Sequence, residues 1–159
     1  RLRKKMENPE TYKPAGVSEV LMVRPCDSGG LEVLEGLSSN FFVVYHDGSL
    51  RTACDGVLHG YVRHLVLECA EACDLVVDER PILLQDATEG LWKETFITSS
   101  SRLIFPISKI LIHDDADQGD SAIFREYWRD PVLTSVVEAS ADKPKWQQLL
   151  DEILRRGGY

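Results

Sequence analysis

The distribution of apolar residues along the chain changes between strand-like and helix-like periods several times. Residues 41–45 are apolar and aromatic throughout, which is typical of a strand covered on both faces. Asp47 and Gly48 follow, and an Asp-Gly pair tolerates the positive φ angles of a tight turn. Residues 50–53 have the composition of a returning strand. We therefore predict an antiparallel hairpin centred on this turn.

Helical spacing dominates two segments. From residue 60 to residue 73, apolar residues recur every three or four positions, which predicts a helix that begins near Gly60. Residues 146–156 predict a last helix, whose apolar stripe consists of Trp146, Leu149, Leu150, Ile153 and Leu154. A short helix is expected over residues 86–92, with Asp86 as its N-cap.

Further strand-like runs are separated by turn residues or by these helices. They occupy residues 18–23, 31–35, 75–80, 94–98 and 103–112, and we expect the last run to continue the same sheet. The order of the elements predicts an α/β (mixed α+β) fold, with a mixed sheet and flanking helices.

Composition narrows the possible partners. The chain has 159 residues, of which 43% are hydrophobic, enough for one domain with a core. Its formal charge of -8 argues against nucleic acid or an anionic membrane as a partner, because both favour cationic surfaces. No apolar run reaches the roughly 20 residues of a membrane-spanning helix. The acidic segment 113–120 lacks the Glu that closes a calcium loop, so we interpret it as a solvated surface loop.

The four scattered cysteines indicate a reducing compartment, and the close pair Cys69 and Cys73 is interpreted as core thiols. Cys26 and Cys54 are isolated, whereas Cys69 and Cys73 are four residues apart on one face of the predicted helix. A zinc site would need paired short spacings, which are missing. Because no secretory signal is visible either, we expect a cytoplasmic protein.

Four blocks of sequence follow one another along the chain: residues 35–42, 47–52, 58–63 and 96–100, with Pro106 after them. In this order they are similar to the C-terminal part of the class IV (fold type IV) pyridoxal-phosphate enzymes, and the resemblance runs from about residue 16 to residue 107. This group includes branched-chain and D-amino-acid aminotransferases and aminodeoxychorismate lyase. The resemblance implies the large C-terminal domain of the D-amino-acid aminotransferase-like fold over residues 16–159. Residues 1–15 would then be the tail of a preceding helix and a connector.

The resemblance implies that pyridoxal 5′-phosphate is the cofactor. Glu35 matches the family's glutamate beside the pyridine nitrogen, where a carboxylate keeps the ring protonated. Without the resemblance, Glu35 would be interpreted as a strand-end acid that faces water. Leu58 matches the apolar residue on the ring face, and its alternative role is core packing.

The phosphate end of the implied site lies at a helix start. Tyr61 and Val62 match the two residues whose backbone N–H groups meet the phosphate, but the family's Pro-Gly-Ile-Thr-Arg has lost its Thr hydroxyl here. Ser100 matches a Thr hydroxyl, while Ser99 replaces a Gly, which requires ordinary backbone angles there or some rearrangement. A plain Ser-rich turn is the alternative for this pair. Arg63 is interpreted as a structural tether.

No catalytic residue is expected in this chain, because the family's Schiff-base lysine falls a few residues upstream of Arg1. Lys4 and Lys5 are interpreted as solvated charges. The chain lacks an initiator Met and the family's N-terminal domain, so we expect a piece of a longer polypeptide that binds the cofactor weakly or not at all by itself. A concave surface should be exposed where that domain docks, which favours self-association.

The resemblance implies that the intact protein is an aminotransferase acting on an amino acid or keto acid, as a homodimer. Two alternatives stay open: a lyase of the same family, and a non-catalytic binding or interaction protein that has kept the fold. A lysine just upstream of Arg1 would discriminate between an enzyme and the non-catalytic alternative.

Overall fold

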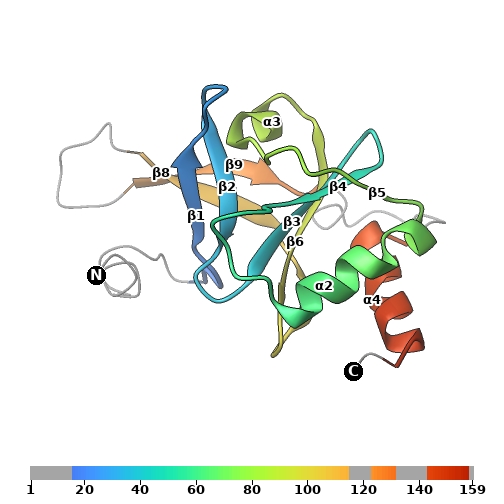
Figure 1. The fold of residues 1–159 in the computed structure, drawn as a ribbon. Helices are drawn as coiled ribbons and strands as arrows, with labels where there is room; N and C mark the ends of the chain where they lie inside the picture. Colours follow the sequence, from blue (N-terminus) through green and yellow to red (C-terminus); the bar gives the residue numbers. More distant parts are fainter. Residues whose placement is uncertain (1–15, 115–122, 132–142, 158–159) are drawn as a thin grey trace.

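The computed structural model describes residues 16–114, 123–131 and 143–157. Seven strands form the main sheet, and two more form a separate hairpin (Figure 1). The strands of the main sheet are β1 Leu21–Pro25, β2 Leu31–Gly36, β3 Asn40–Tyr45, β4 Ser49–Thr52, β5 Val76–Val77, β6 Trp92–Ser99 and β7 Leu103–Pro106. The separate hairpin consists of β8 Lys109–Asp114 and β9 Ile123–Arg129.

Strand β3 is the centre of the main sheet. It pairs antiparallel with β4 on one side and with β6 on the other, and its first residue, Asn40, also pairs with Glu35 of β2. The predicted hairpin around Asp47 and Gly48 is therefore confirmed. Strand β5 runs parallel to β4, whereas the other pairs of this sheet are antiparallel, so the predicted mixed sheet and the α/β (mixed α+β) fold class are confirmed.

Two apolar cores cover the two faces of β3, because successive side chains of a strand point to opposite faces. Phe42 and Val44 belong to the core that contains helices α2 and α4, α2 being Tyr61–Cys69 and α4 Lys145–Arg155. Phe41 and Val43 belong to the second core, together with Trp128 of β9. Every residue of β3 is buried, as the unbroken apolar run predicted.

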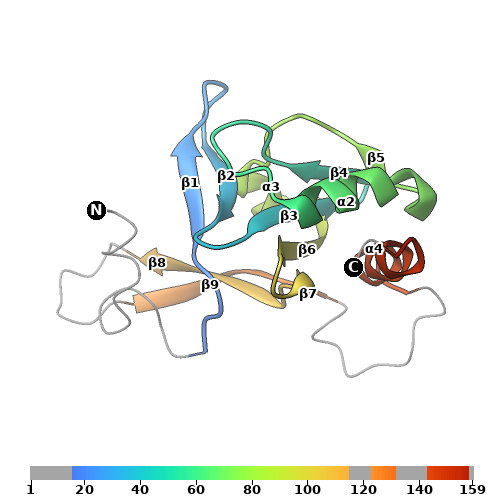
Figure 2. The ribbon, with the colours of Figure 1, turned by 60° about the horizontal axis from the view of Figure 1, so that its bottom comes forward.

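Helices α2 and α4 lie side by side at one end of the molecule, and the β8–β9 hairpin lies at the other (Figures 1 and 2). A short 3-10 helix, Glu71–Cys73, follows α2. The predicted stripe of α4 is mostly correct: Leu149 and Ile153 are buried, and Trp146 and Leu150 pack against the core. Leu154 is 51% exposed and does not belong to it.

Several sequence predictions differ from the structure. The helix expected over residues 60–73 ends at Cys69, and the strand expected over residues 75–80 is limited to Val76–Val77. Strand β8 does not continue the main sheet, because it pairs with β9, a strand that the sequence pattern did not reveal. Helix α3 spans Leu84–Thr88 rather than residues 86–92, and its N-cap is Leu83. Asp86 does not cap it, because its carboxylate accepts a hydrogen bond from the Tyr45 hydroxyl instead. The acidic segment 113–120 lies almost entirely outside the described residues.

Candidate cofactor site

The carboxylate of Glu35 is held at the corner where β2 meets β3. Its Oε2 atom accepts a hydrogen bond from the backbone N–H of Leu58 at 3.1 Å and one from the side-chain amide of Asn40 at 3.3 Å. Glu35 is half-buried. The acid is therefore directed at the segment that leads into α2, and not into open solvent.

Helix α2 begins where the sequence predicted. Gly60 is its N-cap, in an extended conformation and without a side-chain cap, and the first hydrogen bond of the helix runs from the N–H of His64 to the carbonyl of Gly60. The N–H groups of residues 61–63 precede that bond, so they lie at the positive end of the helix dipole. The side chain of Val62 is buried, whereas Leu58 and Tyr61 are 77% and 58% exposed. An apolar surface thus lies beside the helix end.

The two serines lie on the β6–β7 hairpin, which approaches the same region. Thr98 pairs with Asn40, and the side chain of Asn40 contacts Gly60, so the end of β6 lies next to the start of α2. Both ribbon views place the hairpin tip near the first turn of α2 (Figures 1 and 2).

The hairpin itself holds the hydroxyl of Ser99. Its Oγ atom lies 3.3 Å from the Oγ atom of Ser101 and accepts a hydrogen bond from the N–H of Arg102. The backbone of Ser99 has a negative φ, and the left-handed residue of this turn is Leu103, at φ +56°. A side chain in place of the family's glycine is thereby accommodated.

Arg63 fastens α2 to the end of β4, since its Nη2 atom donates to the carbonyl of Ala53 at 3.0 Å and the residue is buried. This contact agrees with its interpretation as a structural tether.

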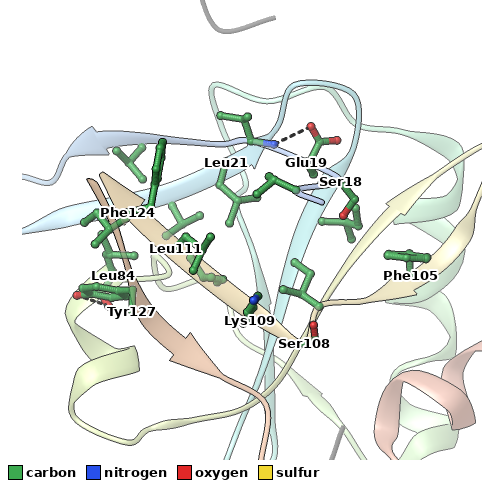
Figure 3. Close-up of a pocket in the computed structure, with 18 of the residues that line it drawn as sticks. Ser18, Glu19, Leu21, Leu84, Phe105, Ser108, Lys109, Leu111, Phe124 and Tyr127 are labelled. Atoms are coloured by element: carbon green, nitrogen blue, oxygen red, sulfur yellow. Dashed lines mark hydrogen bonds between the residues drawn. The ribbon is translucent and has the colours of Figure 1, made fainter. Parts of the chain in front are cut away.

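A large apolar cavity of about 530 Å³ lies away from these residues, between β1, β2, β7 and the β8–β9 hairpin (Figure 3). Leu21, Phe105, Leu111 and Tyr127 are among its lining residues, and none of the six predicted cofactor-binding residues is. Glu19 lies at its rim. Burial opposes ionisation of Glu19, but hydrogen bonds from the hydroxyls of Ser38 and Ser39 and from the N–H of Val20 outweigh it and lower its pKa. The predicted docking of a second domain at a concave surface stays a prediction.

A second cavity of about 490 Å³, which several charged side chains line, lies on the opposite side of β3 from α2. There the guanidinium of Arg51 lies 4.0 Å from the centre of the Tyr45 ring and 3.2 Å from Asp78. Burial, together with the hydrogen bond to Asp86, raises the pKa of Tyr45. Arg51 also lies 3.9 Å from Asp86, and Arg80 pairs with Asp78, so two arginines balance the two aspartates. Sequence reasoning missed this group, whose charges are paired within the fold.

The described residues contain no cluster of three His, Cys, Asp or Glu side chains that could hold a metal ion. Cys69 and Cys73 are buried, and burial raises the pKa of both thiols, as expected for core residues. No helix in the described part of the chain is long and apolar enough to cross a membrane.

Comparisons with known proteins identify the family and the fold of the chain. Residues 10–110 match the family model described as amino-transferase class IV. The chain is similar in structure to 4-amino-4-deoxychorismate lyase from Pseudomonas aeruginosa, with 21% identity and a TM-score of 0.61 over 94% of this chain and 44% of that one. It is also similar to the branched-chain aminotransferase from Thermoproteus uzoniensis with norvaline, with 26% identity and a TM-score of 0.51 over 63% of this chain and 32% of that one. A comparison with curated proteins gave no match.

The chain thus spans less than half the length of either structure. The resemblance found in the sequence is confirmed by the family model, which covers more than half of the chain, and by the fold of these neighbours. The chain belongs to the class IV aminotransferase family.

Proposed function

We propose that residues 16–159 form the C-terminal domain of a pyridoxal 5′-phosphate enzyme that transfers an amino group between an amino acid and a keto acid. This domain would supply one half of the cofactor site. The observation that carries the proposal is the hydrogen bond from the N–H of Leu58 to Glu35, because it joins a carboxylate to the chain that starts α2.

The residues present fit such a cofactor at its ring end. Pyridoxal phosphate is a rigid plate with a ring nitrogen on one side and a phosphate near the other, and when bound it supplies an electron-accepting ring. Both hydrogen bonds that Glu35 accepts within the described part of the chain end on Oε2. Its Oε1 atom would accept a hydrogen bond from the ring N–H and thereby keep that nitrogen protonated.

The phosphate end would lie at the first turn of α2. The N–H groups of Tyr61 and Val62 would bind the phosphate, helped by the helix dipole, and the hydroxyls of Ser99 and Ser100 would reach it from the β6–β7 hairpin. The exposed side chain of Leu58 lies between the two ends in sequence and would cover the ring face and exclude water.

The rest of the site would come from the polypeptide upstream, which would contribute the lysine, and from a second copy in a homodimer. A lyase reaction on the same site is the alternative within the family. One observation favours a non-catalytic binding protein instead: Ser99 already uses its hydroxyl inside the hairpin, and Val62 has none to offer. A lysine just upstream of Arg1 in the full-length sequence would favour the enzyme.

The test is a titration of the 159-residue chain with pyridoxamine 5′-phosphate labelled with ¹⁵N in its ring, followed by ³¹P and ¹⁵N NMR. We expect weak binding, with a Kd of about 1 mM or above. The binding free energy would then be no more favourable than about -4 kcal/mol. Pyridoxamine without its phosphate should bind about 10-fold more weakly or worse, since one charge-assisted contact contributes about 1.5 kcal/mol or more.

The substitution Glu35→Gln should move the bound ring nitrogen resonance toward that of neutral pyridine. Glu32→Gln is the matched control, because Glu32 lies on the same strand but pairs with Arg24. An affinity and ring resonance that Glu35→Gln leaves unchanged would refute the proposed site, and so would a wild-type chain that binds the ligand no better with its phosphate than without it.

A further inference from the structure

The side chain of Asn40 links the two ends of the proposed cofactor site. Its Nδ2 atom donates to Glu35 Oε2 at 3.3 Å and to the carbonyl of Leu58 at 2.5 Å, and its Oδ1 atom accepts from the N–H of Gly60 at 3.3 Å. Asn40 is only 5% exposed. Exchanging the oxygen and nitrogen of the amide would set its oxygen against two acceptors, so the network fixes the orientation of the amide.

We infer that Asn40 is a positioning residue that sets the distance between the Glu35 carboxylate and the first turn of α2. The inference about spacing stands on the three hydrogen bonds alone, whereas its consequence for cofactor binding rests on the proposed function.

Gly60 provides independent support. Its φ of -64° is ordinary for any residue, so this position does not need glycine for its backbone angles. A Cβ atom at residue 60 would instead lie 2.7 Å from Oδ1 of Asn40, closer than such atoms approach. The glycine therefore allows Asn40 to reach the helix end.

The strand that carries Asn40 is held rigidly enough to fix the distance between Glu35 and α2. Asn40 pairs with Glu35 on β2 and with Thr98 on β6, and the strand it begins is buried throughout. A rigid ligand gains affinity when the groups that bind its two ends are held at the correct separation before it arrives. Fixing Glu35 and α2 to one buried side chain achieves this separation without contact between Asn40 and the ligand.

The first experiment is a double-mutant cycle on the chain without ligand. Asn40→Ala, Gly60→Ala and the double variant are unfolded in urea, and their unfolding equilibrium constants are compared. We expect each single substitution to raise the constant, and the double variant to raise it less than the product of the two effects by a factor of about 3 or more, as for residues in contact. The Cβ at residue 60 has less to collide with once the amide is gone.

The second experiment uses the NMR titration with pyridoxamine 5′-phosphate. Asn40→Ala should weaken binding about 10-fold or more and shift the ring nitrogen resonance toward neutral pyridine, since losing a buried hydrogen-bonded partner disturbs both ends of the site. Thr52→Val is the matched control. It removes another buried hydrogen bond of the sheet, from Thr52 to the carbonyl of Phe41, and should leave affinity and resonance as in the wild type.

Should Asn40→Ala not fold, two other variants replace it. In the titration, Asn40→Asp keeps the volume and the acceptor for Gly60 but turns the donor into an oxygen that faces Glu35 and the carbonyl of Leu58, so it should weaken binding. In the double-mutant cycle, Asn40→Ser is used, because its shorter side chain removes the contact with a Cβ at residue 60; strictly additive effects of Asn40→Ser and Gly60→Ala would overturn the link in the same way.

The outcomes separate the two proposals. Strictly additive effects of Asn40→Ala and Gly60→Ala would overturn the link, while the Glu35→Gln result would leave the cofactor site standing. Unchanged ligand affinity and ring resonance in Asn40→Ala would overturn its positioning role, even with coupling to Gly60. A wild-type chain that does not distinguish the phosphorylated ligand would overturn the proposed function and the ligand half of this inference.

Discussion

Glu94 should fasten helix α4 to the sheet, and removing its carboxylate should destabilise the chain. Glu94 lies on β6 and is 3% exposed. Its two oxygens accept hydrogen bonds from the N–H groups of Lys145 and Trp146, at 2.9 and 3.1 Å. These are the first two residues of α4, whose N–H groups have no acceptor inside the helix, and the N-cap, Pro144, offers no side-chain cap.

The expected magnitude follows from these two contacts. A hydrogen bond to a charged group contributes about 1.5–3 kcal/mol, and an acid at a helix N-terminus adds about 0.3–1 kcal/mol. Water can reach the N–H groups once the side chain is gone, which offsets part of the loss. We therefore expect Glu94→Ala to lower the free energy of unfolding by about 2–4 kcal/mol. Glu94→Gln keeps one acceptor and should lose about half as much.

The assay is urea unfolding followed by tryptophan fluorescence and far-UV circular dichroism, with hydrogen exchange of the α4 amides. In Glu94→Ala, exchange should accelerate at Lys145 and Trp146 first. Asp151→Asn is the matched control, because Asp151 lies on the same helix and its ion pair with Lys143 is exposed to solvent, so its loss should change stability little. If Glu94→Ala cost no more than this control, the carboxylate would not hold α4 and the reasoning would be refuted.

Three further predictions concern pH, the hairpin turn and the core. The side chain of Arg80, with a smaller contribution from Arg51, lowers the pKa of Asp78 from 3.8 to about 2. The charged form of Asp78 therefore stabilises the fold by about 1–2 kcal/mol, a figure reduced because Arg80 is exposed. This stabilisation is present above pH 4 and is lost as the pH falls toward 2. Urea midpoints of the wild type and Asp78→Asn should converge over that range, and a constant difference would contradict the assignment. Gly48 has φ +85° and open space around it, so Gly48→Ala should cost about 1 kcal/mol and Gly48→Asn less; equal unfolding free energies of the two variants would argue against strain. Phe42 is fully buried and stacked on Phe96 at 5.0 Å, so Phe42→Ala should lower the free energy of unfolding by about 3–5 kcal/mol in the same assay, and a loss below about 1 kcal/mol would mean that the core refills the cavity.

The hairpin of β3 and β4 could be predicted because its information is local. Asp47 and Gly48 provide the turn, and the Asp47 carboxylate accepts a hydrogen bond from the N–H of Ser49, two residues later. The burial of β3 on both faces was visible in its unbroken apolar run. Likewise, the start of α2 followed from apolar spacing that begins at Val62.

The failures occurred where long-range partners decide the structure. Strand β8 reads as a continuation of the main sheet because its sequence is apolar, but β9, its actual partner, pairs with it across an acidic segment. Asp is a residue type that commonly caps helices, yet the carboxylate of Asp86 accepts a hydrogen bond from the hydroxyl of Tyr45, which lies 41 residues earlier in the chain. Strand β5 has only two residues and pairs parallel with β4. The hydrophobic pattern of so short a run specifies neither the partner strand nor the direction of pairing.

The same distinction explains why the candidate site was predicted only in part. The resemblance pointed to Glu35 and the start of α2, and the structure brings them together through Leu58. Asn40 was part of the matched sequence, but an Asn before an apolar run is typical of a turn, so nothing local distinguished it. The available signal was its position in a buried strand, where Asn is depleted and needs hydrogen-bonding partners.

Glu94 and Asn40 illustrate one physical rule for reading such sequences. Each is a polar residue in or next to an apolar run of a central strand, and each is at most 5% exposed. Burying such a group without partners would cost more free energy than the strand gains, so its presence implies donors or acceptors from another element. In both cases the partner is the start of a helix, because that is where backbone N–H groups are left without acceptors. A buried Glu or Asn on an inner strand therefore predicts a hydrogen-bonding partner from another element. That partner is a helix start for Glu94 and Asn40, whereas for Glu32 on β2 it is the side chain of Arg24 on β1.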